Sequence, residues 1–192
     1  MKLKDITELA CVFLQKTELL DLGVFIDGKS SEAQEELKIN RDLQLLNRCA
    51  NLVYKEVACD YLPLQTQQVF ETEDGILPYA DFRRELQDVK SVTNEAGESV
   101  AFSSWPSHLQ TQAGKVTVKY TYVPQDVEFY DELDYRSGKV SERVFAYGTA
   151  CEYCLISGRY EDASVWEQRY KDALLCCAGK KAEIRLPRRR WA

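Results

Sequence analysis

Catalysis by a Ser–His or Cys–His pair would have to use His108, because it is the only histidine in the chain. Such a pair needs the imidazole within hydrogen-bonding reach of a nucleophile and oriented by a third group. His108 follows Trp105-Pro106-Ser107 in a stretch that predicts a surface loop, with no acid or nucleophile at a recognisable spacing. The pattern favours a loop histidine, and a small hydrolase that uses His108 is the alternative.

The seven cysteines favour reduced core residues over a disulfide framework or a metal site. Their number is odd, and most of them fall where a helical pattern predicts an apolar side chain. Cys151 and Cys154 have CxxC spacing, but a zinc site would need a second CxxC or nearby histidines, and the sequence has neither. We therefore expect no metal and no cofactor. The other cysteines are Cys11, Cys49, Cys59, Cys176 and Cys177.

Carboxylates are abundant, but their sequence positions predict no acid–base pair. Such a pair needs two carboxyl groups in one cleft whose surroundings separate their pKa values, and adjacency such as Asp131-Glu132 does not indicate that. The motifs GxxxxGK[ST], GxGxxG and HExxH are also missing, which weighs against nucleotide-binding and zinc-protease classes. The sequence favours a protein that is not an enzyme.

The last residues of the chain could carry binding. Guanidinium groups form forked hydrogen bonds to carboxylates, and tryptophan anchors well in a pocket. The apolar Ile184, Leu186 and Trp191 favour an interaction segment over a purely solubilising end. A nucleic-acid-binding regulator that uses the arginines is a second alternative. The expected partner-binding residues are Arg185, Leu186, Arg188, Arg189, Arg190 and Trp191.

The second candidate for binding is the stretch Lys115 to Val123, which alternates apolar and polar residues and predicts a strand. A core hairpin is the favoured interpretation. The alternative is an arm that pairs with a neighbouring copy or faces a tail component. Its outward-facing residues would be Lys115, Thr117, Lys119 and Thr121.

Helical spacing at both ends of the chain predicts the elements around these sites. Residues 6–14 predict a short helix, and residues 43–61 predict a long one, with Asn40 as a possible N-cap and Pro63 as its end. Two more helices are expected over residues 140–155 and 160–177, with Leu155 on the apolar face of the first. Ser157-Gly158 joins them, so we expect them to lie side by side.

Between Leu64 and Pro124 the period changes, and turn residues follow one another at short intervals, which predicts strands. Residues 88–93 and 98–102 predict a hairpin around Asn94-Glu95-Ala96-Gly97, interrupted by residues 103–107. We expect an α+β protein with a helical bundle of about four helices, a central antiparallel β insertion and an extended basic C-terminal tail. The divisions are residues 1–63, 64–124, 125–179 and 180–192.

The composition is that of a globular protein, with 45% hydrophobic and 29% charged residues in 192. The net charge of −6 argues against a protein that grips nucleic acid through its phosphates. No apolar run approaches the roughly 20 residues needed to cross a bilayer, so no membrane partner is expected. Asp5 in the first turn argues against a secretory leader.

The order of helix, long helix, β insertion, helix pair and basic tail resembles the head-to-tail connector (adaptor) proteins of tailed bacteriophages and prophages. The hairpin over residues 89–102 and the strand ending in Tyr120-Thr121-Tyr122-Val123-Pro124 are also similar to that family. The closest likeness lies in Ala150-Cys151-Glu152-Tyr153-Cys154-Leu155, Ser157-Gly158-Arg159-Tyr160, Trp166-Glu167-Gln168-Arg169-Tyr170 and Arg185-Leu186-Pro187-Arg188-Arg189-Arg190-Trp191.

The resemblance implies a virion protein, made in the host cytoplasm, that forms a ring of about a dozen copies beneath the capsid portal. The C-terminal segment would dock on the portal protein or on an adjacent subunit, and the β insertion would face the next neck or tail protein. DNA would pass through the ring without specific binding, and another neck or tail-completion protein is the nearest alternative. Acids expected on the channel wall are Asp126, Glu128, Asp131 and Glu132.

Overall fold

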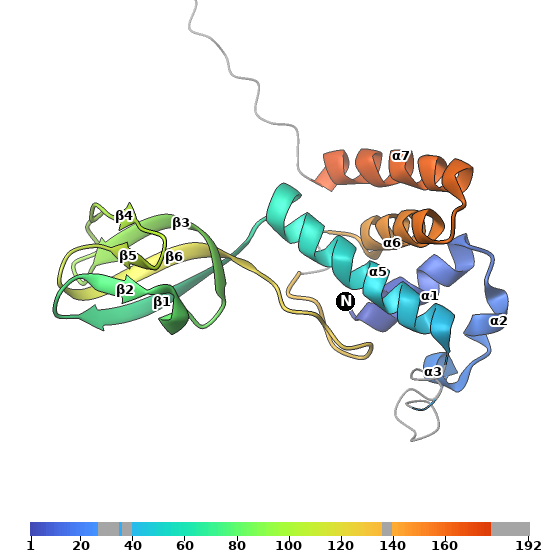
Figure 1. Cartoon of the computed structure of the whole chain (residues 1–192), viewed down its shortest axis with the longest axis horizontal. Helices are drawn as coiled ribbons and strands as arrows, with labels where there is room; N and C mark the ends of the chain where they lie inside the picture. The colour runs from blue at the N-terminus through green and yellow to red at the C-terminus, as the bar shows by residue number, and fades with distance from the viewer. Residues whose placement is uncertain (27–34, 36–39, 136–139, 178–192) are drawn as a thin grey trace, which may run out of the picture.

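The computed structural model describes residues 1–26, 35, 40–135 and 140–177. The molecule is elongated, with a body of helices at one end and a module of β-strands at the other (Figure 1). This mixture confirms the α+β class expected from the sequence. The basic C-terminal tail lies outside the described residues, as do residues 136–139 ahead of the second helix pair.

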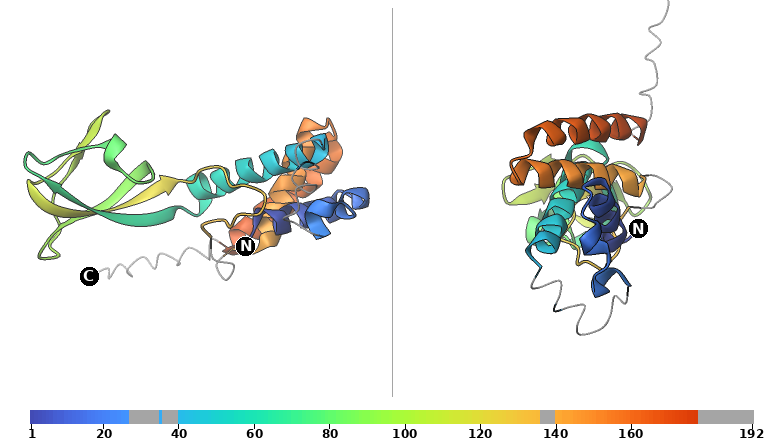
Figure 2. Two further views of the ribbon diagram at one scale, coloured as in Figure 1. Left: turned by 90° about the horizontal axis from the view of Figure 1, so that it is seen from below. Right: turned by 90° about the vertical axis from the view of Figure 1, so that its right-hand side faces the viewer.

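Helix α6 is the centre of the helical body. It spans Glu142–Ile156 and packs against α1 (Leu3–Phe13), α5 (Arg41–Glu56) and α7 (Tyr160–Cys177). Seen end on, α7 covers α6 on one side, while α1 and α5 lie on the other (Figure 2). The short helices α2 (Thr17–Leu20) and α3 (Gly23–Ile26) follow α1. None of the helices in the described part of the chain is long and apolar enough to cross a membrane.

Local caps explain where the helices begin and end. The Asn40 side chain accepts hydrogen bonds from the amides of Asp42 and Leu43 at the start of α5, as expected from the sequence. Ser141 caps α6 in the same way. The turn between α6 and α7 is short because Gly158 adopts φ +73°, which ends a helix without a Cβ clash. The two helices therefore fold back on each other, as expected.

The β module consists of two three-stranded antiparallel sheets. One has the order β1-β6-β3, formed by Leu64–Thr72, Gly114–Val123 and Glu85–Asn94. The other has the order β2-β5-β4, formed by Ile76–Pro78, His108–Gln110 and Ser103–Ser104. Alternate residues of β6 face the core, including Val116, Val118 and Tyr120, which confirms the predicted alternation.

Two expectations about the strands are corrected. The returning strand over residues 98–102 is shorter than expected: only residues 98–100 bond to the backbone of β3, and the chain then leaves to form β4 in the other sheet. β6 is not an arm for a neighbouring copy, because β1 and β3 occupy both of its edges. Thr121, expected to face outwards, is buried and donates its hydroxyl to the Asp88 carbonyl.

Two chain segments join the body to the β module. After α5 the helix widens into a π-helix, Val57–Tyr61, which leads into β1. The return segment, residues 124–135, runs back along the body. Asn51 holds this segment by donating to the Val127 carbonyl and accepting from the Val127 amide, at 3.1 and 2.7 Å. One apolar cluster continues through both parts, from Leu3 and Phe145 in the body to Val118 and Leu109 in the β module.

Candidate binding surface

A groove with a mostly apolar lining lies between helices of the body. Its volume is about 390 Å³, and it lies where α5 and the π-helix meet α6 and α7. Val53, Tyr61, Leu155 and Tyr160 form much of its apolar wall. We call it the helix groove.

A close approach of two helices forms the floor of the helix groove. Gly148 of α6 faces Val53 of α5, and a Cβ at Gly148 would lie 2.5 Å from Val53 Cγ1 and 3.0 Å from Tyr170 Cε2. Only glycine allows this contact without movement of the neighbours. The position therefore sets how deep the groove is and where the Tyr170 ring lies across it.

The rim of the helix groove is acidic. Glu56, Glu152 and Glu167 line it, and the one lysine, Lys171, forms an ion pair with Glu167. Burial raises the pKa of Glu56, and the charges of Glu152 and Asp60 raise it further, against a hydrogen bond from the Tyr170 hydroxyl. The half-buried Glu56 carboxylate is thus held near like charges, a setting that a cation would relieve.

Exposed apolar side chains extend from the helix groove over the end of α6 and along α7. Leu155, Ile156 and Val165 are about half exposed, and Tyr160 and Leu175 are 70% and 72% exposed. Leu155 had been expected on the core face of α6, but Cys154 occupies that face and the next residue must point away. A run of exposed large apolar residues is typical of a surface that another molecule covers.

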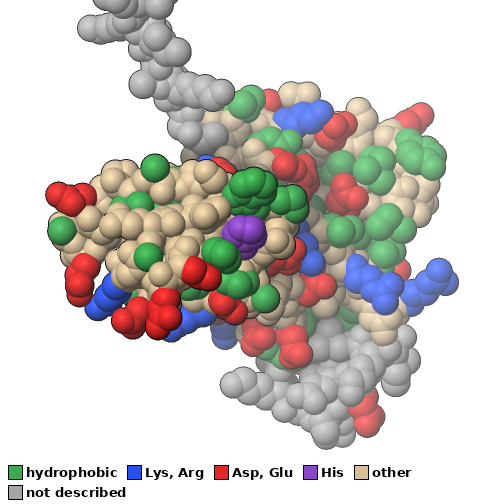
Figure 3. Space-filling model, turned by 60° about the vertical axis from the view of Figure 1, so that its left-hand side comes forward, with side chains coloured by type: hydrophobic (Ala, Val, Ile, Leu, Met, Phe, Trp, Pro, Cys, Tyr) green, Lys and Arg blue, Asp and Glu red, His purple; other side chains and the backbone are tan. Residues whose placement is uncertain are grey.

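A second exposed apolar region lies on the β module. Trp105 is 53% exposed and stacks on His108, with ring centroids 6.2 Å apart, and the Tyr79 hydroxyl donates to the Trp105 carbonyl. Figure 3 shows the histidine among hydrophobic side chains on the forward face of this module. His108 Nδ1 also lies 3.0 Å from the hydroxyl of its neighbour, Ser107. The imidazole is thus part of a small aromatic surface.

The two cysteines with CxxC spacing lie on α6, and their side chains are buried. The Cys151 thiol is 3.5 Å from the Ala163 carbonyl of α7 and serves as a weak donor. Burial raises the pKa of Cys151 to about 11 and also raises that of Cys154, so both remain thiols at neutral pH. Among the described residues, no group of three or more histidine, cysteine, aspartate or glutamate side chains is placed to hold a metal ion.

The acids expected on a channel wall lie on the return segment, and their side chains are exposed. Asp126 forms an ion pair with Lys55 at 2.6 Å, while Glu128, Asp131 and Glu132 surround the buried Phe129 and Leu133. The strand residues Lys115, Thr117 and Lys119 are at least partly exposed on one face of β6. The structure does not bring these two groups to one site. The expected partner-binding residues 185–191 lie outside the described residues.

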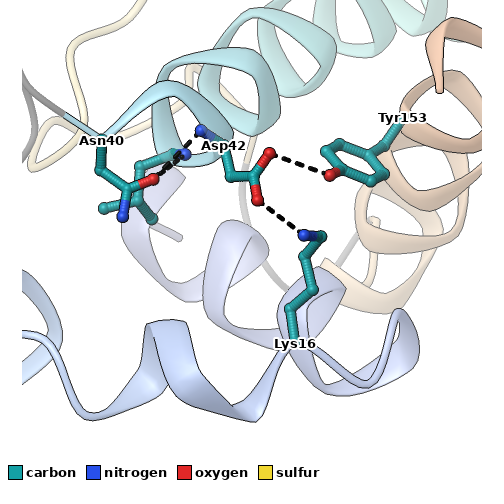
Figure 4. A network of polar contacts seen from close by, with 5 residues as sticks. Lys16, Asn40, Asp42 and Tyr153 are labelled. Carbon is teal, nitrogen blue, oxygen red and sulfur yellow. Dashed lines mark hydrogen bonds and ion pairs between the residues drawn. The ribbon is translucent and has the colours of Figure 1, made fainter.

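A polar network joins the segment between α1 and α2 to α5 and α6 (Figure 4). The Asp42 carboxylate accepts hydrogen bonds from Lys16 Nζ at 2.6 Å and from the Tyr153 hydroxyl at 3.1 Å. These bonds, from Lys16 first, lower the pKa of Asp42. Burial lowers the pKa of Lys16, but its bonds to Asp42 and Tyr153 outweigh that effect and raise it to about 12. The network is a structural clamp.

The sequence interpretation missed the helix groove. Its acids come from α5, α6 and α7, and only tertiary packing brings them together. Two signals were present: Gly148 inside an apolar helix pattern, and the adjacent Leu155 and Ile156, which cannot both face one core.

Neither a family model nor a curated protein matches this chain.

Proposed function

We propose that this chain is a structural subunit that binds copies of itself in a closed ring and joins the portal of a phage capsid to the next neck or tail protein. The observation that carries the proposal is the presence of two different exposed apolar surfaces on one elongated molecule, one on the helical body and one on the β module. One surface is the helix groove with the exposed side of α7. The other surrounds Trp105 on the β module.

Two such surfaces suit a subunit that must contact unlike neighbours. A subunit in a ring needs a heterologous contact to the adjacent copy and further contacts to what lies above and below. The helical body would meet adjacent copies, and the β module would reach the next neck or tail protein. The basic tail, which includes Arg185, Leu186, Arg188 to Arg190 and Trp191, would dock on the portal or an adjacent subunit.

The acidic character of the chain fits a channel through which DNA slides. Exposed carboxylates repel phosphates, so a wall that carries Asp126, Glu128, Asp131 and Glu132 would not retain the duplex. The ring would then extend the portal channel in the virion neck after synthesis in the host cytoplasm.

Co-migration with the portal ring encoded by the same genome tests the proposal. Full-length protein should move with the portal ring in a density gradient, and a chain that ends at Lys181 should keep its helical circular dichroism but lose the portal. Duplex DNA serves as the control ligand. Tight DNA binding with a steep salt dependence, together with no portal binding, would favour a nucleic-acid-binding regulator instead.

A further inference from the structure

We propose that the helix groove of one copy binds residues 178–192 of the adjacent copy, with carboxylates of the rim facing the arginines and the apolar wall receiving Leu186 or Trp191. This inference rests on the proposed function, since it names the contact that links one subunit to the next. Both parts of the contact belong to every copy, so the same pairing can repeat around a ring.

The helix groove requires an occupant that is both basic and apolar. Its wall offers Val53, Leu155 and Tyr160, whose burial would remove apolar surface from water. Its rim offers Glu56 and Glu152, whose carboxylates have no ion pair among the described residues. A cation placed between them would relieve the repulsion that their charges create.

The chain contains one stretch with this combination outside the described residues. Six of its 25 lysine and arginine residues lie in 178–192, against one of its 31 acidic residues, Glu183. Ile184, Leu186 and Trp191 lie among the arginines, and arginine and tryptophan are both enriched in interaction hot spots. The remainder of the chain is therefore strongly acidic, and charge complementarity pairs this segment with the rim.

Length also permits the contact. Fifteen residues follow Cys177, and an extended segment of that size spans up to about 50 Å. The proposed contact places the segment in an extended conformation, because Pro187 disfavours a helix that continues from Leu186 into the arginines. To enter its own groove the segment would have to reverse at once and run back along α7, whereas a neighbouring copy can offer its groove directly.

Reciprocal charge reversal in the full-length protein tests the inference. The groove variant is Glu56→Lys/Glu152→Lys, and the tail variant is Arg188→Glu/Arg189→Glu/Arg190→Glu. Each alone should weaken self-association by about tenfold or more, measured by sedimentation velocity. An equimolar mixture should recover self-association, because each groove then meets a tail of opposite charge. The control Glu8→Lys/Asp172→Lys makes the same change in charge outside the groove and should self-associate like the wild type.

The outcomes separate this inference from the proposed function. If both variants self-associate as strongly as the wild type, the groove contact is overturned and the ring proposal still stands. Variants that fail alone and do not recover when mixed would indicate that the tail binds its own groove, which also overturns the inference. Wild-type protein that stays monomeric with the portal present would remove the proposed function itself.

Folding is checked for every variant by circular dichroism and thermal unfolding. Glu56 is half-buried and accepts a hydrogen bond from the Tyr170 hydroxyl, so Glu152→Lys alone replaces the double variant if that protein unfolds. A peptide of residues 178–192 gives an independent measurement through competition with self-association of the wild-type chain. It should dissociate the assembly, while a peptide with Arg188 to Arg190 changed to glutamate should not. Equal effects of the two peptides would contradict the inference.

Discussion

Gly148 lies where α6 comes closest to α5, and the contact with Val53 fixes the spacing of the two helices. Gly148→Ala gains about 1 kcal/mol in helix propensity, but overpacking of a filled contact costs about 1–3 kcal/mol. We expect a net loss of up to about 2 kcal/mol in the free energy of unfolding, measured with urea.

The companion variant for this position is Val53→Ala, which removes the two methyl groups that an alanine at 148 would meet. The double variant should lose less than the sum of the two single losses, by about 1 kcal/mol. Strictly additive losses would mean that the helices move apart freely and that the close contact does not set the groove.

The Lys16–Asp42–Tyr153 clamp makes a prediction about pH. The pKa of Asp42 is lowered in the folded protein, so its stabilisation is present above the unfolded value near 3.8 and is lost as pH falls through the lower folded value. Lys16 acts at the other limit: its stabilisation is complete below 10.5 and is lost as pH rises through about 12. In Asp42→Asn, the free energy of unfolding should therefore fall less between pH 7 and pH 3 than it does in the wild type, as measured by urea unfolding at each pH.

The control for the clamp is Lys16→Gln, because the lowered pKa of Asp42 depends first on that lysine. In the Lys16→Gln background, Asp42→Asn should change the pH dependence much less than it does in the wild type. An equal change in both backgrounds would mean that the pH dependence comes from the position of Asp42 in the first turn of α5 and not from its ion pair with Lys16.

At the scale of elements, the return segment depends on Asn51. Asn51→Asp keeps the acceptor for the Val127 amide but loses the donor to the Val127 and Asn47 carbonyls, and it places a carboxylate against them. We expect a loss of about 1–3 kcal/mol in the free energy of unfolding. Lys55→Gln, one turn further on, breaks only the exposed pair with Asp126 and should cost less than about 1 kcal/mol. Equal losses would contradict a specific role for Asn51.

The elements that the sequence predicts well are those with local causes. Asn40 caps α5, Gly158 ends α6, and the alternation of β6 follows its burial, because each depends on residues close together in the chain. The π-helix Val57–Tyr61 was expected to be ordinary helix, since nothing in its composition marks the wider turn. The pairing of β4 with β5 was missed because the two strands are short.

The candidate surface was harder to predict than the elements for a physical reason. Glu56 and Glu152 lie about a hundred positions apart in sequence, and Leu155 had been expected in the core. A periodic pattern indicates which face of a helix is apolar but not which third helix stops short of covering it. α7 packs against α6, and the groove lies beside this contact, where residues of α5, α6 and α7 line it.

At the scale of the whole molecule, shape and charge support the same interpretation. The helical body and the β module share a continuous apolar cluster and are joined by two segments, so side chains of both parts pack in one core. Acidic residues outnumber basic ones in residues 1–177, while basic residues outnumber acidic ones in residues 178–192. A subunit with a basic segment and an acidic groove is suited to head-to-tail assembly.

Electron microscopy of the purified full-length protein, alone and mixed with the portal ring of the same genome, tests the central claim most directly. The account predicts closed rings with a central channel, stacked coaxially on the portal and built from about a dozen copies. Particles that remain single subunits in both samples, with portal rings left bare, would contradict it.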